Sequence, residues 1–383
     1  MKVLVTDGNF KHTLAAVRSL GKNGAEVTVF SHLFICVSFF SKYCRHRVIA
    51  PDPEKDPMFA AFLLEYVKKN HVDVLLPISF AAVMQVSRIR NELEKYVKIP
   101  LADDEALYIA GSKDRTIKYA ETIGIRVPKT WYPLTESDVE VIAREASYPA
   151  VIKGSEESGF VRYANTPGEL LEKFRCISRY SPVIQEYITG EGYGFFALYN
   201  HGTARAIFMH KRIREYPVTG GPSAVAESVY IPALRDAGLR ILDRLNWHGV
   251  AMVEFKKDEK TGEFILMEIN PKFWGSLGLS IAAGVDFPSL ACTMAIDGDI
   301  DPVCQYKTGV KYRWLFPADL FHVMTKPRAL HQFVQDFSDR TIRYDIDIHD
   351  PAPAFMQMGM TVAEFVIRVK QKRFWRPHGR PHC

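Results

Sequence analysis

The sequence VAMVEFKKDEKTGEFILMEINPKFWGS occupies residues 250–276, and it largely decides the fold that we expect for the chain. Apolar and polar residues alternate from Val250 to Lys257 and again from Glu263 to Asn270, and the segment DEKTG, residues 258–262, separates the two runs. Alternation with a period of two is typical of half-buried strands, and a short glycine-containing segment between two such runs is typical of a turn. The stretch therefore predicts an antiparallel hairpin.

Two glutamates of this hairpin are expected to face each other. If the runs pair about the turn, Glu254 lies opposite Glu268, and Asn270 shares their face because side chains alternate along a strand. Directly opposed carboxylates lie about 5 Å apart at Cβ and repel each other. Two carboxylates and an amide are hard oxygen ligands that suit Mg²⁺ between them. The alternative is a solvated face with incidental glutamates. It is disfavoured because Met252 and Leu266 make the strands apolar, and a buried acid requires a partner.

The first hundred residues have the pattern of a small α/β lobe. Residues 2–6, KVLVT, form a β-branched run, and a helix-periodic stretch from Thr13 to Lys22 precedes a second strand pattern, Glu26 to Phe30. This β-α-β order predicts parallel strands joined by a right-handed crossover. The first turn lacks G-x-G-x-x-G, because Gly8 is followed by NFKH. A dinucleotide-binding oxidoreductase is therefore disfavoured.

Two lysines are candidates for binding phosphate. Lys153 ends a strand pattern, residues 150–153, and precedes a loop that contains Ser155 and Gly159. The small residues of such a loop let backbone N–H groups approach an anion. Lys113 begins a helix pattern, and the N-terminus of a helix also favours anions. Ordinary surface lysines are the alternative interpretation at both positions.

The composition restricts the class of protein. The chain has 383 residues, of which 47% are hydrophobic and 24% charged, which is typical of a globular protein with several lobes. Its net charge of +5 suits anionic ligands. The basic cluster Lys370–Arg380 is terminal, and we interpret it as solvated or as a partner contact, so nucleic-acid binding is not expected. The six cysteines follow no metal or disulfide spacing. The apolar run Leu33–Phe40 is far shorter than the roughly 20 residues that span a membrane. We expect a cytoplasmic protein without membrane association.

Four segments, taken in order, give the chain a family resemblance. They are SKDRTIKYAETIGIRVP at 112–128, YPAVIKGSEESG at 148–159, VIQEYITGEGYG at 183–194 and VEFKKDEKTGEFILMEINPKFWGS at 253–276. The chain resembles the ATP-grasp superfamily, whose members include biotin carboxylase, carbamoyl-phosphate synthetase and D-alanine–D-alanine ligase. The resemblance covers residues 1–300, and its most specific part is the E-x-N-P-x-x-W-G-S stretch.

The resemblance implies a nucleotide site. Lys113 and Lys153 match the two basic residues that contact nucleotide phosphates in the family. Glu191 falls where an acid often holds the ribose. The segment that reads adenine is matched by Glu186, Tyr187 and Ile188.

The resemblance also implies a metal site and shows one departure from the family pattern. The magnesium ligands are matched by Glu254, Glu268 and Asn270, and Mn²⁺ is an alternative metal. Many members have an arginine two residues after the asparagine, whereas this chain has Lys272. Lysine keeps the charge but loses the bidentate fork of a guanidinium. Arg212 or Arg214 is expected to supply that planar contact, with a surface strand as the alternative.

The expected fold is α/β and α+β: a doubly wound parallel-sheet lobe, residues 1–101, followed by a two-lobed ATP-grasp fold. Within the latter we expect a lid region at 102–190 and a metal and catalytic region at 191–300, and residues 301–383 form an extension that the sequence does not place. A set of acidic residues in this extension resembles a metal cluster, but we interpret it as a solvated strand and turn. The set consists of Asp345, Asp347, His349 and Asp350.

The expected activity is that of an ATP- and Mg²⁺-dependent ligase that activates a small-molecule carboxylate as an acyl phosphate for attack by an amine. A bicarbonate-activating enzyme of the carboxylase or carbamoyl-phosphate type is one alternative. A non-catalytic ATP-binding regulatory protein is another, which Lys272 keeps open and the complete set of two glutamates and an asparagine disfavours. A homodimer is also considered.

Overall fold

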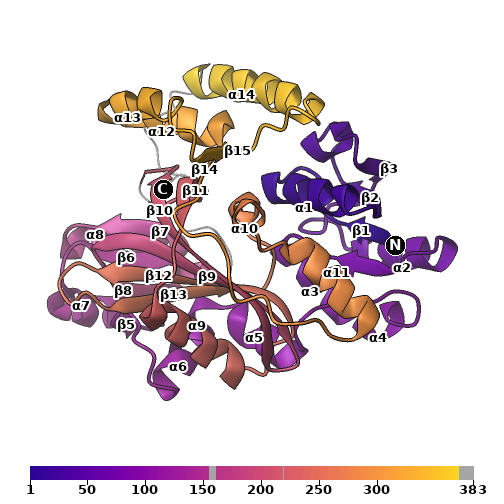
Figure 1. Ribbon diagram of the computed structural model, residues 1–383. Helices are drawn as coiled ribbons and strands as arrows, with labels where there is room; N and C mark the ends of the chain where they lie inside the picture. The colour runs from indigo at the N-terminus through magenta and orange to yellow at the C-terminus, as the bar shows by residue number, and fades with distance from the viewer. Residues whose placement is uncertain (155–160, 219, 371–383) are drawn as a thin grey trace.

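The computed structural model describes residues 1–154, 161–218 and 220–370, which form three β-sheets with helices packed around them (Figure 1). The N-terminal sheet is parallel, with the strand order β3-β2-β1-β4, as the sequence pattern predicts. Its strands are β1 (Lys2–Val5), β2 (Glu26–Ser31), β3 (Cys44–Ile49) and β4 (Val74–Leu76). Helix α1 (Lys11–Lys22) covers the face that carries Val3 and Val5, whereas α2 (Phe59–Lys69) covers the face that carries Leu4. The lobe is therefore doubly wound. Its other helices are η1 (Val37–Phe40), α3 (Phe80–Arg88) and α4 (Arg90–Leu93).

A seven-stranded sheet forms the centre of the molecule, in the order β13-β12-β9-β10-β11-β14-β15. All neighbouring strands are antiparallel except β14 and β15. The strands are β9 (Gly190–Asn200), β10 (Thr203–Glu215), β11 (Ser223–Ser228), β12 (Gly249–Asp258), β13 (Phe264–Asn270), β14 (Lys311–Arg313) and β15 (Ile342–Tyr344).

Both faces of the central sheet are apolar, because alternate residues of its long strands enter different cores. Phe195, Val253 and Phe255 pack with helix α9 (Pro232–Arg244) on one face. Phe196 and Met252 pack on the other face, where α10 (Leu277–Ala283) and α11 (Phe287–Asp297) also meet α1 of the N-terminal lobe. Among the described residues no single helix is long and apolar enough to cross a membrane; α10 and α11 meet that criterion only as a pair bent by 82°.

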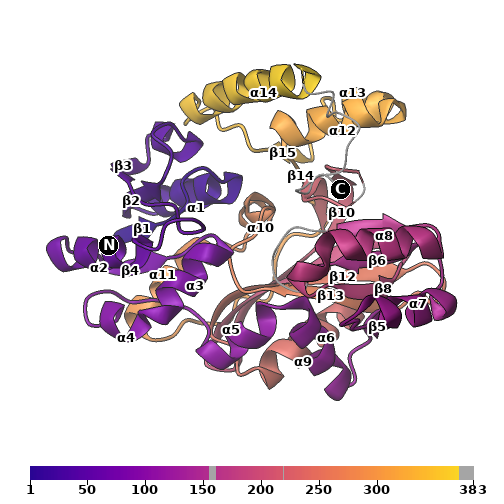
Figure 2. The same ribbon diagram turned by 180° about the vertical axis from the view of Figure 1, so that it is seen from behind.

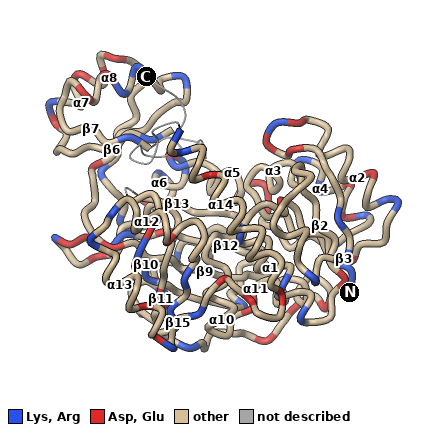
Figure 3. The backbone as a smooth tube through the Cα atoms, turned by 90° about the horizontal axis from the view of Figure 1, so that it is seen from above, with Lys and Arg blue, Asp and Glu red and all other residues tan. Residues whose placement is uncertain are grey.

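A smaller sheet forms the lid, which lies on the side of the molecule away from the N-terminal lobe (Figure 2) and projects from it in the view from above (Figure 3). Its strand order is β5-β8-β6-β7, and all pairs are antiparallel. The lid contains β5 (Thr130–Trp131), α7 (Glu136–Glu145), β6 (Ala150–Lys153), β7 (Val161–Ala164), α8 (Pro167–Ile177), η2 (Ser178–Tyr180) and β8 (Val183–Glu186). Val139, Leu170 and Phe174 belong to its own core. The two helices that precede it pack against β13, so the lid sheet begins later than residue 102. These helices are α5 (Asp104–Ala110) and α6 (Lys113–Thr122).

The C-terminal part completes the central sheet and adds a layer of helices at one edge (Figure 1). The helices are η3 (Leu315–Asp319), α12 (Leu320–Thr325), η4 (Pro327–Ala329), α13 (Leu330–Gln335) and α14 (Ala352–Lys370). A buried ionic cluster connects this layer to β10 and β14. In it, Asp319 accepts hydrogen bonds from Arg214 Nε at 2.7 Å and from Arg313 Nε at 2.5 Å. Asp336 forms a second ion pair with Arg214.

The expectation that the acidic residues near 345–350 are solvated is wrong for two of them. Asp345 and Asp350 are both buried. Asp350 accepts hydrogen bonds from Arg18 Nε at 2.8 Å, from Ser41 Oγ at 2.7 Å and from the backbone N–H of Lys42 at 2.8 Å. These donors come from the N-terminal lobe, more than 300 residues away, so no local pattern could have indicated them. The carboxylate thus fastens the C-terminal layer to α1.

The buried cluster around Asp319 predicts a large effect on stability. We expect Asp319→Ala to lower the free energy of unfolding by about 3–5 kcal/mol, because it leaves two buried guanidinium groups short of a counter-charge. The measurement is urea unfolding followed by circular dichroism. Asp236→Ala, which removes an acid of an exposed ion pair, is the control and should change stability by less than about 0.5 kcal/mol. Equal effects of the two substitutions would contradict the conclusion that Asp319 balances the charges of two buried guanidinium groups.

Candidate active site

The acidic pair lies where the hairpin prediction puts it. Glu254 of β12 pairs directly with Glu268 of β13. Nearer the turn, however, Phe255 pairs with Leu266, so the register shifts by one residue between the two pairs. A β-bulge at Met267 absorbs this shift. The bulge lets Leu266 remain in the core while Glu268 still faces Glu254, and the spacing of the residues did not reveal it.

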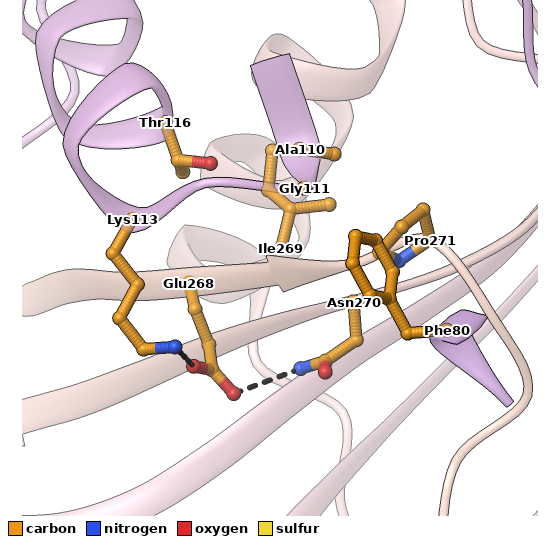
Figure 4. A pocket seen from close by; sticks show the side chains of 9 residues that line it. All are labelled: Phe80, Ala110, Gly111, Lys113, Thr116, Glu268, Ile269, Asn270 and Pro271. Carbon is orange, nitrogen blue, oxygen red and sulfur yellow. Dashed lines mark hydrogen bonds and ion pairs between the residues drawn. The ribbon is translucent and has the colours of Figure 1, made fainter. Parts of the chain in front are cut away.

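Basic side chains from other elements balance the two carboxylates. Arg212 Nη2 of β10 lies 2.6 Å from Glu254 Oε2, and Lys113 Nζ at the start of α6 lies 3.5 Å from Glu268 Oε2. Asn270 Nδ2 donates to Glu268 Oε1 at 3.0 Å (Figure 4). Burial alone would raise the pKa of Glu268, but Lys113, Asn270 and nearby lysines outweigh burial, and the pKa is lowered. The carboxylate of Glu268 is therefore ionised at neutral pH.

Lys153 reaches the acidic pair from the lid. It is the last residue of β6 and is 9% exposed. Burial lowers its pKa to about 8, against the opposing attraction of Glu268 and Glu254. A desolvated ammonium group at this position gains from any anion that approaches it. Ser155 and Gly159, expected in the phosphate loop that follows, lie outside the described residues.

The expected adenine segment is the connection between two sheets. Strand β8 leaves the lid at Glu186, whose Oε1 accepts a hydrogen bond from the backbone N–H of Lys129 at 2.9 Å. Tyr187 is partly exposed, and the carbonyl oxygen of Ile188 accepts a hydrogen bond from Lys256 Nζ at 2.9 Å. Glu191, at the start of β9, forms an ion pair of 2.7 Å with Lys211. The segment thus lies at the junction of the lid and the central sheet, close to the acidic hairpin.

The two candidate arginines have different environments. Arg212 contacts Glu254, as described above, whereas the guanidinium group of Arg214 is buried between Asp319 and Asp336. A register shift between these two residues in the β10–β11 pairing separates their surroundings. The structure therefore brings only Arg212 to the acidic pair. Lys272 lies beside it, since its Nζ donates to Asn270 Oδ1 at 3.5 Å.

Three further basic residues near the site were not anticipated from the sequence. Lys256 follows Glu254 by two positions, so strand alternation could have placed it on the same face. Lys11 and His12 follow the first strand of the parallel sheet, where ligands of α/β folds commonly bind. Lys11 Nζ donates to the carbonyl oxygen of Ser223 at 3.1 Å, and burial lowers its pKa to about 8. Burial and the neighbouring Lys272 lower the pKa of His12 to about 3, so its ring is neutral.

The donors present suit a divalent metal and a polyanion together. Glu254, Glu268 and the amide oxygen of Asn270 are hard ligands on one face of a rigid strand pair. Cations from α6, the lid and β10 converge on the same place, so an anion held by the metal would lie among positive side chains. Metal-bound phosphates have this chemistry.

Comparisons of the sequence with known proteins found a matching family model and related proteins. A family model described as "ATP-grasp in the biosynthetic pathway with Ter operon" matches residues 181–317. The large chain of carbamoyl phosphate synthase from Thermotoga neapolitana is 25% identical over 297 residues, which are 71% of this chain and 27% of that protein. This chain therefore spans well under half of the relative's length.

Two solved structures share the architecture. N5-carboxyaminoimidazole synthetase from Staphylococcus aureus, complexed with ADP, superposes with a TM-score of 0.66 at 15% identity and covers 86% of both chains. An L-amino acid ligase from Bacillus licheniformis gives a TM-score of 0.60 at 17% identity, over 79% of this chain and 77% of the other. At such identities the likeness is one of fold, and it confirms the fold expected from the sequence.

The environment of Lys153 predicts that its charge, although suited to binding an anion, lowers the stability of the folded protein. We expect Lys153→Met to raise the free energy of unfolding by about 1–3 kcal/mol at pH 7, because it removes a charge that burial disfavours. The unfolded chain binds this proton more tightly than the folded protein. The difference in the free energy of unfolding between the variant and the wild type is therefore largest below about pH 8, where the lowered pKa lies. It disappears as the pH rises through the ordinary pKa of 10.5.

Urea unfolding of both proteins at several pH values measures this difference. Lys69→Met, which removes an exposed lysine, is the matched control and should show no such pH dependence. A loss of stability in Lys153→Met at pH 7 would contradict the interpretation.

Proposed function

The chain belongs to the ATP-grasp superfamily, and on that premise we propose that it is an ATP- and Mg²⁺-dependent ligase that activates a small carboxylate for attack by an amine. One observation supports this most strongly. Glu254 and Glu268 face each other on a strand pair, and basic side chains from three other elements converge on them. A site built only for stability would not require two opposed acids among several cations, since a buried ionic cluster is seldom more stable than an apolar one.

The nucleotide is proposed to lie between the lid and the central sheet. Lys153 from the lid and Lys113 from α6 would contact its phosphates, since both ammonium groups lie near Glu268. The segment from Glu186 to Ile188 would hold adenine with its backbone, and Glu191 would receive the ribose hydroxyls. The position of this segment between two sheets supports the proposal, because a flat adenine base there would contact both the lid and the central sheet.

The metal is proposed to bind Glu254, Glu268 and Asn270. Mg²⁺ suits these oxygen ligands, and Mn²⁺ would suit them too. The metal would neutralise negative charge on the phosphates during transfer. For metal binding, the amide of Asn270 must present Oδ1, which Lys272 contacts, and Glu254 must share its carboxylate between the metal and Arg212. Both groups have a free lone pair for this purpose.

The side chains of the site would mainly position and neutralise. As the terminal phosphoryl group moves in line to the carboxylate, negative charge spreads over its oxygens. Lys153 and Lys113 would stabilise that charge from two directions, and Arg212 supplies the planar donor that Lys272 lacks. The lid would keep water away from the acyl phosphate, which hydrolyses readily.

The substrate pair is identified by screening. Purified protein is incubated with ATP, Mg²⁺ and pools of amino acids and small carboxylates, with bicarbonate in a separate arm, and ADP release is followed by mass spectrometry of the products. An amide product supports the proposal. Turnover with bicarbonate alone would favour the carboxylase or carbamoyl-phosphate type of chemistry, and nucleotide binding without turnover in any arm would favour a regulatory protein.

The metal assignment predicts that Glu268→Gln lowers Mg²⁺-dependent ATP turnover by roughly 10²–10³-fold, because a neutral amide binds the cation more weakly. Circular dichroism should show an unchanged fold. Glu259→Gln, in the exposed turn of the same hairpin, is the matched control and should retain full activity. The assignment fails if Glu268→Gln turns over ATP at the wild-type rate.

The proposed role of Arg212 predicts a graded loss of activity. We expect Arg212→Met to lower kcat by about 10²–10³-fold and Arg212→Lys to lower it by about tenfold, since lysine keeps the charge without the fork. Arg205→Lys on the same strand, in an ion pair with Asp299 at the far end of β10, is the control and should have little effect. Steady-state kinetics with the identified substrates measure kcat and KM. Wild-type kcat in Arg212→Met would rule out a role in transfer.

A further inference from the structure

A cleft lies where the N-terminal lobe, the central sheet and the C-terminal part of the chain meet. It is lined by helices α1 and α10, by strand β14 and by residues 345–348, which follow β15. Helix α10 lies between α1 and β14 (Figures 1 and 2). The volume of the cleft is about 420 Å³, which is within the range of roughly 300–1,000 Å³ that small-molecule sites occupy.

The walls of this cleft are mainly apolar. Leu14 of α1 and Ile281 of α10 line it, and Tyr312 and Trp314 of β14 add an aromatic wall in which the ring centroids are 4.8 Å apart. Ile348 also lines the cleft and is 81% exposed, so it lies where the cleft opens to solvent. These side chains provide an environment that suits an apolar group of a ligand.

Most of the charged side chains in the cleft already have partners within the protein. Lys22 Nζ forms an ion pair of 2.7 Å with Asp347. Arg18 Nη1 donates to the carbonyl oxygen of Asp345 at 2.7 Å, and Arg18 Nε donates to Asp350 at 2.8 Å. These groups therefore do not require a ligand.

The carboxylate of Asp345 is not satisfied in the same way. The residue is 7% exposed, and its Oδ1 accepts only a long hydrogen bond, of 3.4 Å, from the backbone N–H of Leu315. Its Oδ2 is buried and has no hydrogen-bond partner. Burial raises the pKa of Asp345 to about 6, so the group is still ionised at pH 7.5. A buried carboxylate oxygen without a donor is costly, and a ligand that supplies a positively charged donor would remove that cost.

Lys11 provides the opposite charge in the same cleft. Its Nζ donates to the carbonyl oxygen of Ser223 at 3.1 Å and lies 4.4 Å from the ring centroid of Trp314. An ammonium group has three protons to donate, so this leaves capacity for a further acceptor. The charges of Lys11 and Asp345 attract each other, but no ion pair joins the two side chains, both of which are within the described residues. The cleft therefore holds two opposite charges apart.

We propose that this cleft binds an α-amino acid with an apolar side chain, whose ammonium group pairs with Asp345 and whose carboxylate pairs with Lys11. The apolar walls would contact its side chain. A simple amine would leave Lys11 without a counter-charge, and a simple carboxylate would leave Asp345 without a donor. Arg343 also lines the cleft and is exposed, so it adds positive charge that favours the carboxylate of the ligand.

This site is distinct from the acidic pair of the hairpin, because neither glutamate of that pair is among the residues that line the cleft. The inference therefore does not rest on the proposed ligase activity. It is tested by binding alone, in the absence of nucleotide and metal, so a failure of either proposal leaves the other intact.

Isothermal titration calorimetry of the full chain at pH 7.5 measures this binding. The probes are L-leucine and L-phenylalanine, each compared with its amine lacking the carboxylate (isoamylamine, phenethylamine) and its acid lacking the amino group (isocaproate, hydrocinnamate). We expect at least one of the two amino acids to bind. Both of its analogues should bind at least roughly tenfold more weakly, because each leaves one charge of the cleft unpaired.

Asp345→Asn should weaken binding of the amino acid by at least roughly tenfold, because the amide keeps the size of the side chain but loses its charge. Asp347→Asn is the matched control: it removes a carboxylate of the same cleft that already pairs with Lys22, and it should change the Kd by less than about twofold. Equal losses in the two variants would indicate a general effect of charge and would overturn the assignment to Asp345.

Ala282→Phe tests the location without altering a charge. Ala282 lines the cleft from α10 and is partly exposed, so a phenyl group there should fill the space and weaken binding by at least roughly tenfold. Ala233→Phe, the same exchange at an exposed alanine of α9, is its control and should bind like the wild type. Circular dichroism establishes that each variant is folded.

Three results would overturn the proposal. The first is that neither amino acid binds to the wild type. The second is that an amine or an acid analogue binds as tightly as its parent amino acid. The third is that folded Ala282→Phe binds the amino acid with the wild-type Kd, which would place the ligand elsewhere in the molecule.

Discussion

The opposition of Glu254 and Glu268 is the constraint on which the site depends. Two carboxylates on neighbouring strands repel each other, and the cost is greater in a partly buried place than in water. Attraction to cations from separate parts of the chain offsets this repulsion: Lys113 lies on α6, Arg212 on β10 and Lys153 in the lid. Each cation must be held in place by its own element. The acidic pair therefore determines which surfaces have to meet.

The contacts that bring those surfaces together lie away from the pair. Arg214, two residues from Arg212, is held between Asp319 and Asp336, so β10 is fixed to the C-terminal layer. Asp350 at the other end of that layer is bound to Arg18 of the N-terminal lobe. The C-terminal residues thus serve as a brace across the molecule.

Lys272 now has a defined setting. It contacts the amide of Asn270, and its charge helps to keep the partly buried ring of His12 neutral. A point charge at this position can hold the asparagine and attract an anion, whereas the planar, bidentate contact has to come from elsewhere. Arg212 is the guanidinium that the fold directs to Glu254. The departure from the family pattern at residue 272 is thus accompanied by an arginine on β10, which β9 separates from β12 in the central sheet.

The sequence by itself determined the features that depend on local order. Alternation in the hairpin predicted that Glu254 faces Glu268, and the β-α-β pattern predicted the parallel sheet of the first lobe. The order of the lysine, adenine and acidic segments gave the chain its resemblance to the ATP-grasp superfamily, and that resemblance implied the fold. Each of these features follows from the period of a strand or from the order of motifs along the chain. None of them requires knowledge of which distant residues come into contact.

Only the tertiary structure decided which side chains meet. The pairing of strands and the packing of the sheet decide three features of the site. These are the bulge at Met267, the burial of Arg214 and the contact of Arg212 with Glu254. The contact between Arg18 and Asp350 joins residues 332 positions apart, so the acidic residues near 345–350 resembled a solvated turn.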